Sequence, residues 1–375
     1  MIGPDGYHWP VVIRLRTGTV TAVKEARAGI LDLLVEVDGR PERALAYPEL
    51  TGPVAEGDHV VLNTTAVELG LGTGGFHLVV AVEGGADVDP RPGGHVMKLR
   101  YTPVQAKVEA VEEQGSPHHD VLRQADGLDG LPVAWVPLHS MVGAAVAGAR
   151  AAGAARIAYV MTDGAALPLW LSDQVDALRR AELLDAAITS GQALGGDVEA
   201  VTLFSALLAA RHVVDADVVV VADGPGKVGT GTTWGSSDVA AGMALNAAAI
   251  LGGRPVAALR LNFADPVYRH HGVSPHSLTV LERVAVLPVH VAVPVFDDER
   301  QRDLVWSSLR AAKLEERHQL VETAGGPALE LLVERGVPMA SMGRDAREEP
   351  ALFLAAGAAG VLAGRMAAGA ARWKR

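Results

Sequence analysis

The pattern of hydrophobic and polar positions divides the chain into two parts. Over residues 1–115, short runs rich in Val, Leu and Thr are separated by Gly, Pro and Asp-Gly turns. Runs of this length and spacing are typical of a small β-barrel or β-sandwich. The runs occupy residues 11–26, 33–47 and 58–69, and a closing run occupies 95–113. We therefore predict a small β-rich, barrel-like domain over residues 1–115, with the Gly- and Pro-rich segment 84–94 as a flexible joint.

The second part, residues 116–375, has a different pattern. Continuous apolar runs alternate with helix-like segments, which predicts a mainly parallel β-sheet covered by helices on both faces. The predicted strands occupy residues 133–138, 156–162, 185–190, 217–223, 256–262, 289–296, 318–323 and 338–343. Eight strand–helix units in about 240 residues also fit a (β/α)8 barrel, which has about 250 residues.

The predicted helices favour an open sheet over the barrel. Segments 140–153, 239–253 and 352–364 are apolar on nearly all sides, whereas 175–184 and 300–316 are amphipathic. A barrel exposes all its helices to a similar extent, but an open sheet buries its central helices. We therefore predict an α/β domain that is Rossmann-like and doubly wound, with the (β/α)8 barrel as the alternative. The apolar helices are expected to lie in the core or in a homodimer interface.

A glycine-rich loop, VADGPGKVGTGTTWGSSD at residues 221–238, follows the fourth predicted strand. Gly224, Gly226 and Gly229 form a GxGxxG pattern. A dinucleotide-binding loop opens its helix at those glycines and has an acidic residue about 20 positions later. Here the helix is expected to begin near Ser236, and a threonine stands where a P-loop has its lysine. Neither nucleotide-binding template is a good match.

The composition of this loop instead suits an anion-binding nest. A run of glycines lets successive backbone N–H groups turn toward one point, and Lys227 adds a positive charge. The residues expected to bind the anion are Gly224, Gly226, Gly229, Thr230 and Gly231. The alternative is a long turn in which Ser236 or Ser237 caps the next helix. The length of the loop and its position at a strand end favour the functional interpretation.

Polar residues follow most of the predicted strands. In parallel α/β sheets, ligands bind at the carboxyl ends of the strands, so these residues are candidates for a shared site. Those expected to take part in acid–base chemistry are His139, Asp163, Asp197, Asp265, His270 and His276. Arg269 and Arg344 are expected to pair with an anionic ligand. The alternative role for Asp197, as for Ser172 and Ser236, is that of a helix N-cap.

The segment from Asp265 to His276 is dense in such residues. It contains one aspartate, one arginine and three histidines within twelve residues. His and Asp are ligands for zinc, manganese or iron, but the spacing matches no standard motif such as HExxH. A metal site, a metal-free site and a structural loop all remain open at this point, and no cofactor is identified.

Composition narrows the functional class. The chain has 375 residues, a formal net charge of −11 and no cysteine. Thiolate metal sites are therefore excluded, and the acidic balance does not support a general nucleic-acid partner. The N-terminus lacks the pattern of a signal peptide, and the apolar stretch Ala351–Gly364 is too short to span a bilayer. We therefore expect a cytoplasmic protein that binds neither nucleic acid nor membrane.

Several of these segments resemble a family of bacterial proteins classified as domain of unknown function 3866. The matching segments, within residues 95–345, are MKLRYTPVQ, PLHSMV, YVMTDGAALP, ITSGQALGGDVEAV, ADGPGKVGTGT, FADPVYRHHGVSPHSLT and SMGR. The resemblance implies no known activity, but it implies that the strand ends form one shared constellation. The family pattern has His where this chain has Gln192 and Pro275, so a metal site of the relatives would lack ligands here.

Three functions follow as hypotheses. The first is an enzyme, or an enzyme-like protein, that binds a small phosphate- or carboxylate-bearing metabolite at the strand ends. The second is a non-enzymatic module that senses a ligand or forms a dimer, with the N-terminal β domain contacting a partner. The third is a divalent-metal hydrolase with His and Asp ligands.

Overall fold

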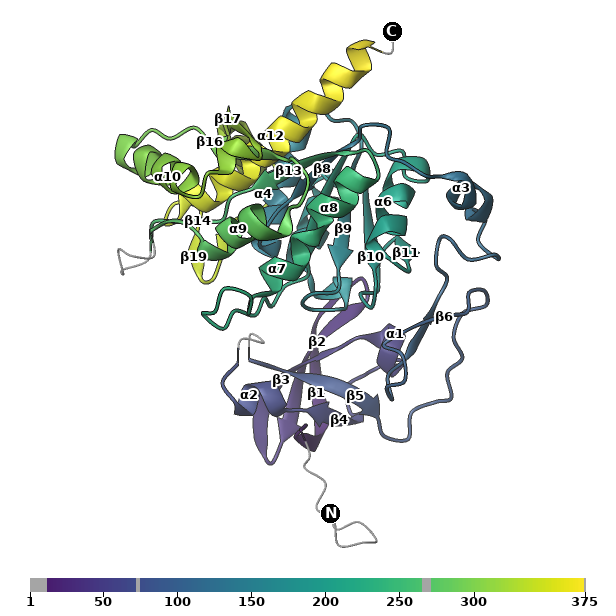
Figure 1. Ribbon diagram of the computed structural model, residues 1–375. Coiled ribbons are helices and arrows are strands. Elements are labelled where there is room, and N and C mark those ends of the chain that lie inside the picture. Colours follow the sequence, from purple (N-terminus) through teal and green to yellow (C-terminus); the bar gives the residue numbers. More distant parts are fainter. Residues whose placement is uncertain (1–11, 72–74, 265–270, 374–375) are drawn as a thin grey trace, which may run out of the picture. The chain divides into compact units, whose positions relative to one another are not determined.

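Two compact units make up the chain. The computed structural model describes residues 12–71, 75–264 and 271–373, with side chains up to residue 369. The units are Met1–Pro92 and Gly93–Arg375, and Figure 1 colours the chain in sequence order. The division falls within the predicted joint at 84–94, and the predicted boundary after residue 115 lies inside the second unit.

The first unit contains a closed β-barrel with the strand order β1-β2-β3-β5-β4. Its strands are β1 (Leu15–Arg27), β2 (Ile30–Val37), β3 (Arg40–Ala46), β4 (His59–Asn63) and β5 (Phe76–Val82), with the short helices α1 (Pro48–Thr51) and α2 (Thr65–Glu68). Neighbouring strands are antiparallel except β3 and β5, which are parallel. Alternating residues such as Leu33 and Val35 fill the barrel core. The predicted small barrel is confirmed.

The strand that completes the barrel is β5, and not the predicted closing run at 95–113. That run forms an antiparallel hairpin of β6 (Val96–Lys98) and β7 (Ala106–Val108) within the second unit. The hairpin belongs there because the buried side chain of Lys98 binds backbone carbonyls of the parallel sheet. A strand pattern alone does not show which sheet a hairpin joins.

The second unit contains a parallel sheet of eight strands. Their order is β11-β10-β9-β12-β8-β13-β16-β17, and every pair of neighbours is parallel. The strands are β8 (Pro132–Trp135), β9 (Ile157–Thr162), β10 (Ala186–Ser190), β11 (Val198–Ala200), β12 (Val218–Asp223), β13 (Arg254–Ala258), β16 (His290–Pro294) and β17 (Gln319–Thr323). Because β11 and β17 lie at opposite edges, the sheet is open, and the alternative (β/α)8 barrel is wrong.

One predicted strand lies outside this sheet, and one strand of the sheet was not predicted. The run at 338–343 contributes β18 (Ala340–Ser341), which pairs only with β19 (Arg344–Asp345) in a separate hairpin. The eighth strand of the sheet is β11, which has three residues. A strand this short has too few apolar residues to show a pattern. The remaining short elements are α3 (His119–Gln124), β14 (Leu261–Asn262), β15 (Gly272–Val273), α9 (Pro275–Thr279), a π-helical segment at Val280–Val284 and the 3-10 helices at His139–Met141, Leu169–Leu171 and Leu314–Glu316.

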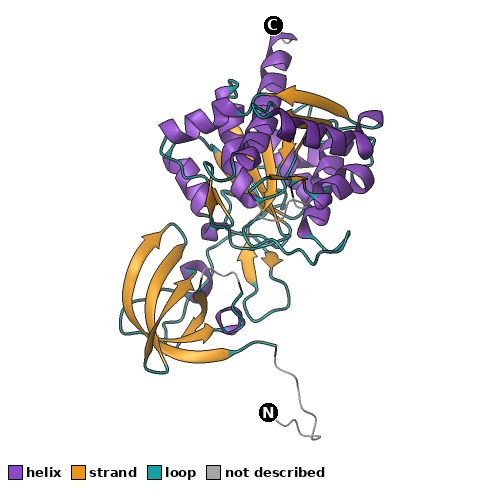
Figure 2. Ribbon diagram, turned by 90° about the vertical axis from the view of Figure 1, so that its left-hand side faces the viewer, coloured by secondary structure: helices purple, strands orange, loops and turns teal. Residues whose placement is uncertain are grey.

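Helices cover both faces of the sheet, as Figure 2 shows. One face packs against α4 (Val142–Ala151), α5 (Asp173–Arg180), α11 (Gly326–Glu334) and α12 (Pro350–Trp373). The other face packs against α6 (Leu203–His212), α7 (Ser237–Ala241), α8 (Met243–Ile250) and α10 (Glu299–Ala311). The strands are apolar on both sides for this reason: Val219 belongs to one core and Val220 to the other.

The apolar helices α4 and α12 pack against each other within the chain. Gly360 lies so close to the carbonyl oxygen of Ala145 that a Cβ atom at this position would overlap it. This packing buries the apolar faces that suggested a homodimer interface, so their composition requires no second copy. Helix α12 continues beyond the predicted stretch Ala351–Gly364. The segment Pro350–Gly369 of this helix is long and apolar enough to cross a membrane. However, 72% of its most apolar 18-residue stretch is buried inside the protein, as in a core helix.

Candidate functional site

The carboxyl ends of β9, β12 and β8 are neighbours in the sheet, at the point where the connecting helices change from one face of the sheet to the other. The helices that follow β8 and β9 lie on one face, whereas those that follow β12 and β13 lie on the opposite face. In open α/β sheets the ligand crevice forms at such a change. The side chains at this edge therefore define the candidate site.

Four charged side chains converge at this edge, and we call them the Asp223 cluster. They are Asp223 at the end of β12, Lys227 in the glycine-rich loop, Asp238 in α7 and Arg260 after β13. The ammonium of Lys227 pairs with Oδ1 of Asp238 and lies 3.5 Å from Oδ2 of Asp223. The guanidinium of Arg260 lies 3.6 Å from Oδ2 of Asp238. The two aspartates are only 1% and 0% exposed, so both carboxylates are removed from water.

Among the residues that the structure describes, none donates a hydrogen bond to two of the carboxylate oxygens of the Asp223 cluster. Oδ1 of Asp223 accepts the hydroxyl of Thr162, and Oδ1 of Asp238 accepts the ammonium of Lys227. Oδ2 of each aspartate is buried without a hydrogen-bond partner. Buried carboxylate oxygens are normally paired, because an unpaired buried polar group costs about 1–3 kcal/mol. Each of these two oxygens can still accept a hydrogen bond.

His139, a predicted acid–base residue, holds the backbone of Asp223. Its Nε2 lies 2.6 Å from Oγ of Ser172, and its Nδ1 lies 3.1 Å from the backbone oxygen of Asp223. Since Oγ of Ser172 accepts the N–H of Val175 as the N-cap of α5, we assign its proton to Nε2 of His139 and the ring proton to Nδ1. Burial lowers the pKa of His139 to about 4, so the ring is neutral at pH 7. The phenol of Tyr159 donates to the same backbone oxygen, and burial raises its pKa well above the usual range.

The glycine-rich loop is an internally hydrogen-bonded hairpin, and its role as an anion nest stays a prediction. The backbone N–H groups of Thr230 and Ser237 donate across it to the carbonyls of Gly235 and Val228. A loop of this length can pair with itself, and pairing uses backbone N–H groups that a nest would direct at an anion. The ammonium of Lys227, expected to attract the anion, is already paired with the carboxylates of the Asp223 cluster.

The predicted glycines have different roles within this hairpin. Gly224 is buried so close to a neighbouring backbone oxygen that a Cβ atom would overlap it. Gly226 and Gly231 turn the chain with positive φ angles of 92° and 72°. Gly229 lies in the paired part of the hairpin, opposite the N-cap of α7. Because α7 begins only after this hairpin, its N-terminus is not placed as the dinucleotide template requires.

The structure brings His276 to the glycine-rich loop but places Asp197 elsewhere. Nε2 of His276 lies 3.1 Å from the backbone oxygen of Thr232, at the tip of the loop. Asp197 precedes β11 at the level of Ala187, near the amino end of β10. There it accepts the N–H of Ala187 and pairs with Arg179. Asp197 is thus neither at the carboxyl edge nor a helix N-cap, because the chain must return to the amino end to begin a parallel strand.

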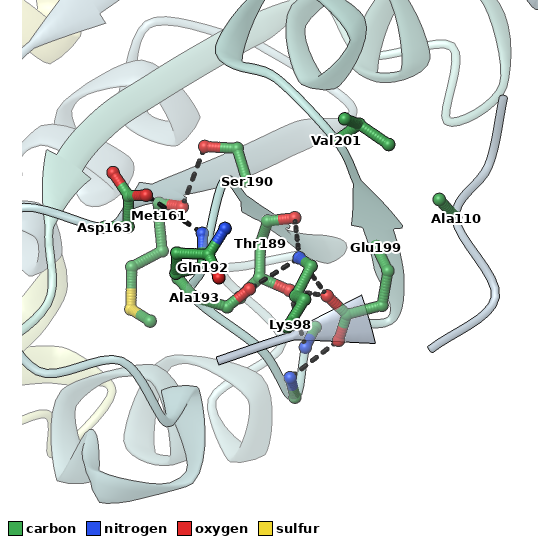
Figure 3. Close-up of polar contacts among 12 residues, drawn as sticks. Lys98, Ala110, Met161, Asp163, Thr189, Ser190, Gln192, Ala193, Glu199 and Val201 are labelled. Atoms are coloured by element: carbon green, nitrogen blue, oxygen red, sulfur yellow. Dashed lines mark hydrogen bonds and ion pairs between the residues drawn. The ribbon is translucent and has the colours of Figure 1, made fainter. Parts of the chain in front are cut away.

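Asp163 lies at the carboxyl edge, as predicted, where it orders a neighbouring loop. Its Oδ2 accepts the backbone N–H of Gln192 at 2.9 Å (Figure 3). Asp265, Arg269 and His270 lie outside the described residues, so their assigned roles stay predictions. Within the described part of the chain, no three His, Asp or Glu side chains are grouped so as to hold a metal ion.

The comparison with known families decides the membership of the chain. The model of the family described as "Protein of unknown function (DUF3866)" matches residues 43–360. The chain belongs to the DUF3866 family. This confirms the resemblance carried by the segments between residues 95 and 345. No curated protein and no solved structure matches the chain.

The region matched by the DUF3866 model also includes the buried Lys98 of β6, which Figure 3 shows beside Thr189, Ala193 and Glu199. Nζ of Lys98 donates to the backbone oxygens of Thr189 and Ala193, at 3.2 and 2.6 Å, and to Oε2 of Glu199, at 2.7 Å. Glu199 also accepts the hydroxyl of Thr189 and the N–H of Gly195, at 2.6 and 2.7 Å. We call these five residues the Lys98 cluster. Its ammonium has three acceptors, and both oxygens of its carboxylate have donors.

The sequence pattern does not identify Asp238, Arg260 or Lys98. Asp238 follows a serine N-cap, a position where acidic residues are common because they stabilise the helix dipole. Lys98 lies in a run that reads as an exposed strand of the barrel. The available signal is Arg260, because a cation inside the apolar run VAALRLN requires a buried partner.

Proposed function

We propose that this DUF3866 protein is a cytoplasmic enzyme, or an enzyme-like binding protein, for a small metabolite that carries a phosphate or a carboxylate. The proposal rests on the Asp223 cluster, in which four charged side chains from separate elements meet at the carboxyl edge of the sheet. Buried charges destabilise a fold unless they are fully paired. Two of its buried carboxylate oxygens have no hydrogen-bond partner and only a cation at 3.5 or 3.6 Å, which favours ligand binding over stability as the role of the cluster.

The acidic group of the ligand is assigned to Arg260. Its side chain is 28% exposed, and its guanidinium lies 3.6 Å from Asp238 and 3.9 Å from the sulfur of Met342. A guanidinium has five N–H donors, so it can bind a carboxylate or phosphate through two of them while it keeps its contact with Asp238. Arg344, in the same hairpin as Met342, is the next cation assigned to the anion.

Proton transfer is assigned to His276. It lies at the glycine-rich loop, and its imidazole can exchange a proton with a bound molecule. His139 is assigned a positioning role, because both of its ring nitrogens are used to hold the backbone of Asp223. In this functional sense the second unit is Rossmann-like: its ligand lies at the point where the helices change face.

Thermal unfolding of the full chain with a panel of phosphate esters, hydroxy acids and amino acids tests this proposal. A ligand at 100 times its Kd stabilises a protein by about 2.7 kcal/mol, which raises Tm by several degrees. We expect a shift in the wild type that Arg260→Gln abolishes. Arg211→Gln is the matched control, because Arg211 is also partly buried and pairs with Asp129 and Asp215. No shift with any acid, or an equal loss in both variants, contradicts the proposal.

A further inference from the structure

The two carboxylate oxygens of the Asp223 cluster that have no hydrogen-bond donor indicate which further group the ligand brings. Oδ2 of Asp223 and Oδ2 of Asp238 are both acceptors, and both are fully buried. A phosphate or carboxylate offers only more acceptors and cannot pair with them. A hydrogen-bond donor on the ligand can pair with both carboxylates. The acidic group assigned to Arg260 is therefore only one part of the ligand.

The charge balance of the cluster favours a cationic donor. Asp223 and Asp238 are balanced by Lys227 and Arg260, so the cluster is formally neutral. An acid that binds alone adds a negative charge beside two buried carboxylates, where repulsion is weakly screened. A ligand that also carries an ammonium adds one negative charge fewer than the same acid without it. A metal cation is a poorer fit, because no third carboxylate or histidine joins these two among the described residues.

We propose that the ligand is an amine that also carries an acidic group, such as an amino acid or an amino-phosphate. This inference rests on the proposed function, and it assigns the ammonium to Asp223 and Asp238 and the acid to Arg260. An ammonium has three N–H donors, enough to pair with both Oδ2 atoms. Hydrogen bonds between an ammonium and a carboxylate are about twice as strong as neutral ones.

Lys227 occupies the place that the ammonium of the ligand would take. Its Nζ pairs with Asp238 and lies 3.5 Å from Asp223, and its side chain is 11% exposed. It lies on the glycine-rich hairpin, whose residues Val228 and Trp234 are exposed to solvent. The ligand therefore displaces an internal ammonium, and the hairpin moves with Lys227. If this is correct, Lys227 competes with the ligand and does not bind its acidic group.

Two sets of matched molecules test the inference on the full chain. The first set is L-alanine, L-lactate and propionate, which share a carbon skeleton and differ in having an ammonium, a hydroxyl or neither. The second set is phosphoethanolamine, glycol monophosphate and ethyl phosphate. Calorimetric titration is expected to show the amine of each set binding about tenfold more tightly than its two partners, the effect of roughly one charge-assisted hydrogen bond.

Variants locate this preference within the protein. Asp223→Asn and Asp238→Asn are expected to remove the preference for the amine. Asp185→Asn, in which a carboxylate paired with Arg150 at 2.6 Å is neutralised, is expected to keep it. Lys227→Met is expected to bind the amine several-fold more tightly than the wild type, because the competing ammonium is gone. Weaker binding by Lys227→Met shows instead that Lys227 binds the acid and overturns the assignment of its role.

The outcomes for the two proposals are distinct. Equal binding of all three molecules in each set overturns the inference and leaves the proposed function intact. Tighter binding of L-lactate and glycol monophosphate than of the amines also overturns it, because the donor is then a hydroxyl. No binding by any acid in either set contradicts the proposed function itself.

Discussion

Two lysines pair with carboxylates inside the second unit, and the two clusters differ in how completely their polar atoms are hydrogen-bonded. In the Lys98 cluster, the ammonium has three acceptors and both oxygens of Glu199 have donors. In the Asp223 cluster, two carboxylates share the ammonium of Lys227, and two buried oxygens have no hydrogen-bond donor. Lys98 is 1% exposed and joins a hairpin to the sheet, whereas Lys227 lies on a loop.

Under the proposed function, this difference separates a lysine that serves the fold from one that lies at a ligand site. A fully paired charge such as Lys98 fixes the position of one element on another, here β6 on the loops at the end of β10. An incompletely paired cluster destabilises the fold, and such clusters persist at sites where a ligand completes the pairing. The contrast between the two clusters can be tested variant by variant.

The largest expected effect is on stability, at Lys98. Lys98→Met removes a buried ammonium and leaves the mostly buried carboxylate of Glu199 without its cation, so we expect the free energy of unfolding to fall by about 3–5 kcal/mol. Lys227→Met is expected to lower it by less than half as much, because the loop can move and admit water. Urea denaturation at pH 7 measures both values. Equal losses in the two variants would remove the distinction between the clusters.

Lowering the pH is expected to reduce the free energy of unfolding through His139, which binds the backbone of Asp223. Burial lowers the pKa of His139 from 6.5 to about 4. The unfolded chain therefore binds a proton below pH 6.5 while the folded ring stays neutral, so this stability is complete above pH 6.5 and is lost between 6.5 and 4. The shift corresponds to about 3 kcal/mol. Thermal unfolding across this range should show a shallower pH dependence in His139→Gln than in the wild type.

A second histidine provides the control for this pH dependence. Burial also lowers the pKa of His318, whose Nε2 lies 2.7 Å from the backbone oxygen of Leu281. His318→Gln is expected to flatten the pH dependence of stability without changing ligand binding. The ring nitrogens of His318 bond the backbone of Val289 and Leu281, which belong to neither cluster. An unchanged pH profile in His139→Gln argues against the assigned protonation state of its ring.

The smallest effect on stability is expected for Asp238→Asn, which is compared with the corresponding change in the Lys98 cluster, Glu199→Gln. Glu199→Gln removes the charge that pairs with Lys98, and we expect a loss of about 2–3 kcal/mol in the free energy of unfolding. Asp238→Asn removes one of two carboxylates that share a single ammonium, and we expect a change of less than about 1 kcal/mol in either direction. Chemical denaturation of both variants checks this. A large loss in Asp238→Asn would show that Asp238 serves the fold.

Much of the fold could be predicted from the sequence because strand and helix patterns are local. The apolar runs that became β8, β9 and β12 are long enough to show that both faces are buried. The three-residue β11 carries no such signal. The allocation of β6 to the second unit depends on Lys98, whose acceptors lie about ninety residues away in the chain.

Only those residues of the candidate site that follow a predictable strand end could be placed from the sequence. The sequence correctly places His139 and Asp163 at the carboxyl edge, because Asp163 directly follows β9 and His139 comes four residues after the end of β8. Asp197 was misplaced because the turn before β11 returns the chain to the opposite edge. The pairing of Lys227 with Asp238 depends on how the glycine-rich loop folds back, and loop composition does not determine that.

The most direct test of the account is the change in Tm produced by phosphoethanolamine in two variants, Asp238→Asn and Glu199→Gln. The account predicts that Asp238→Asn keeps most of its stability and loses the shift seen in the wild type. It predicts that Glu199→Gln is destabilised and keeps the shift. A full shift in Asp238→Asn, or its loss in Glu199→Gln, would contradict the assignment of the ligand to the Asp223 cluster.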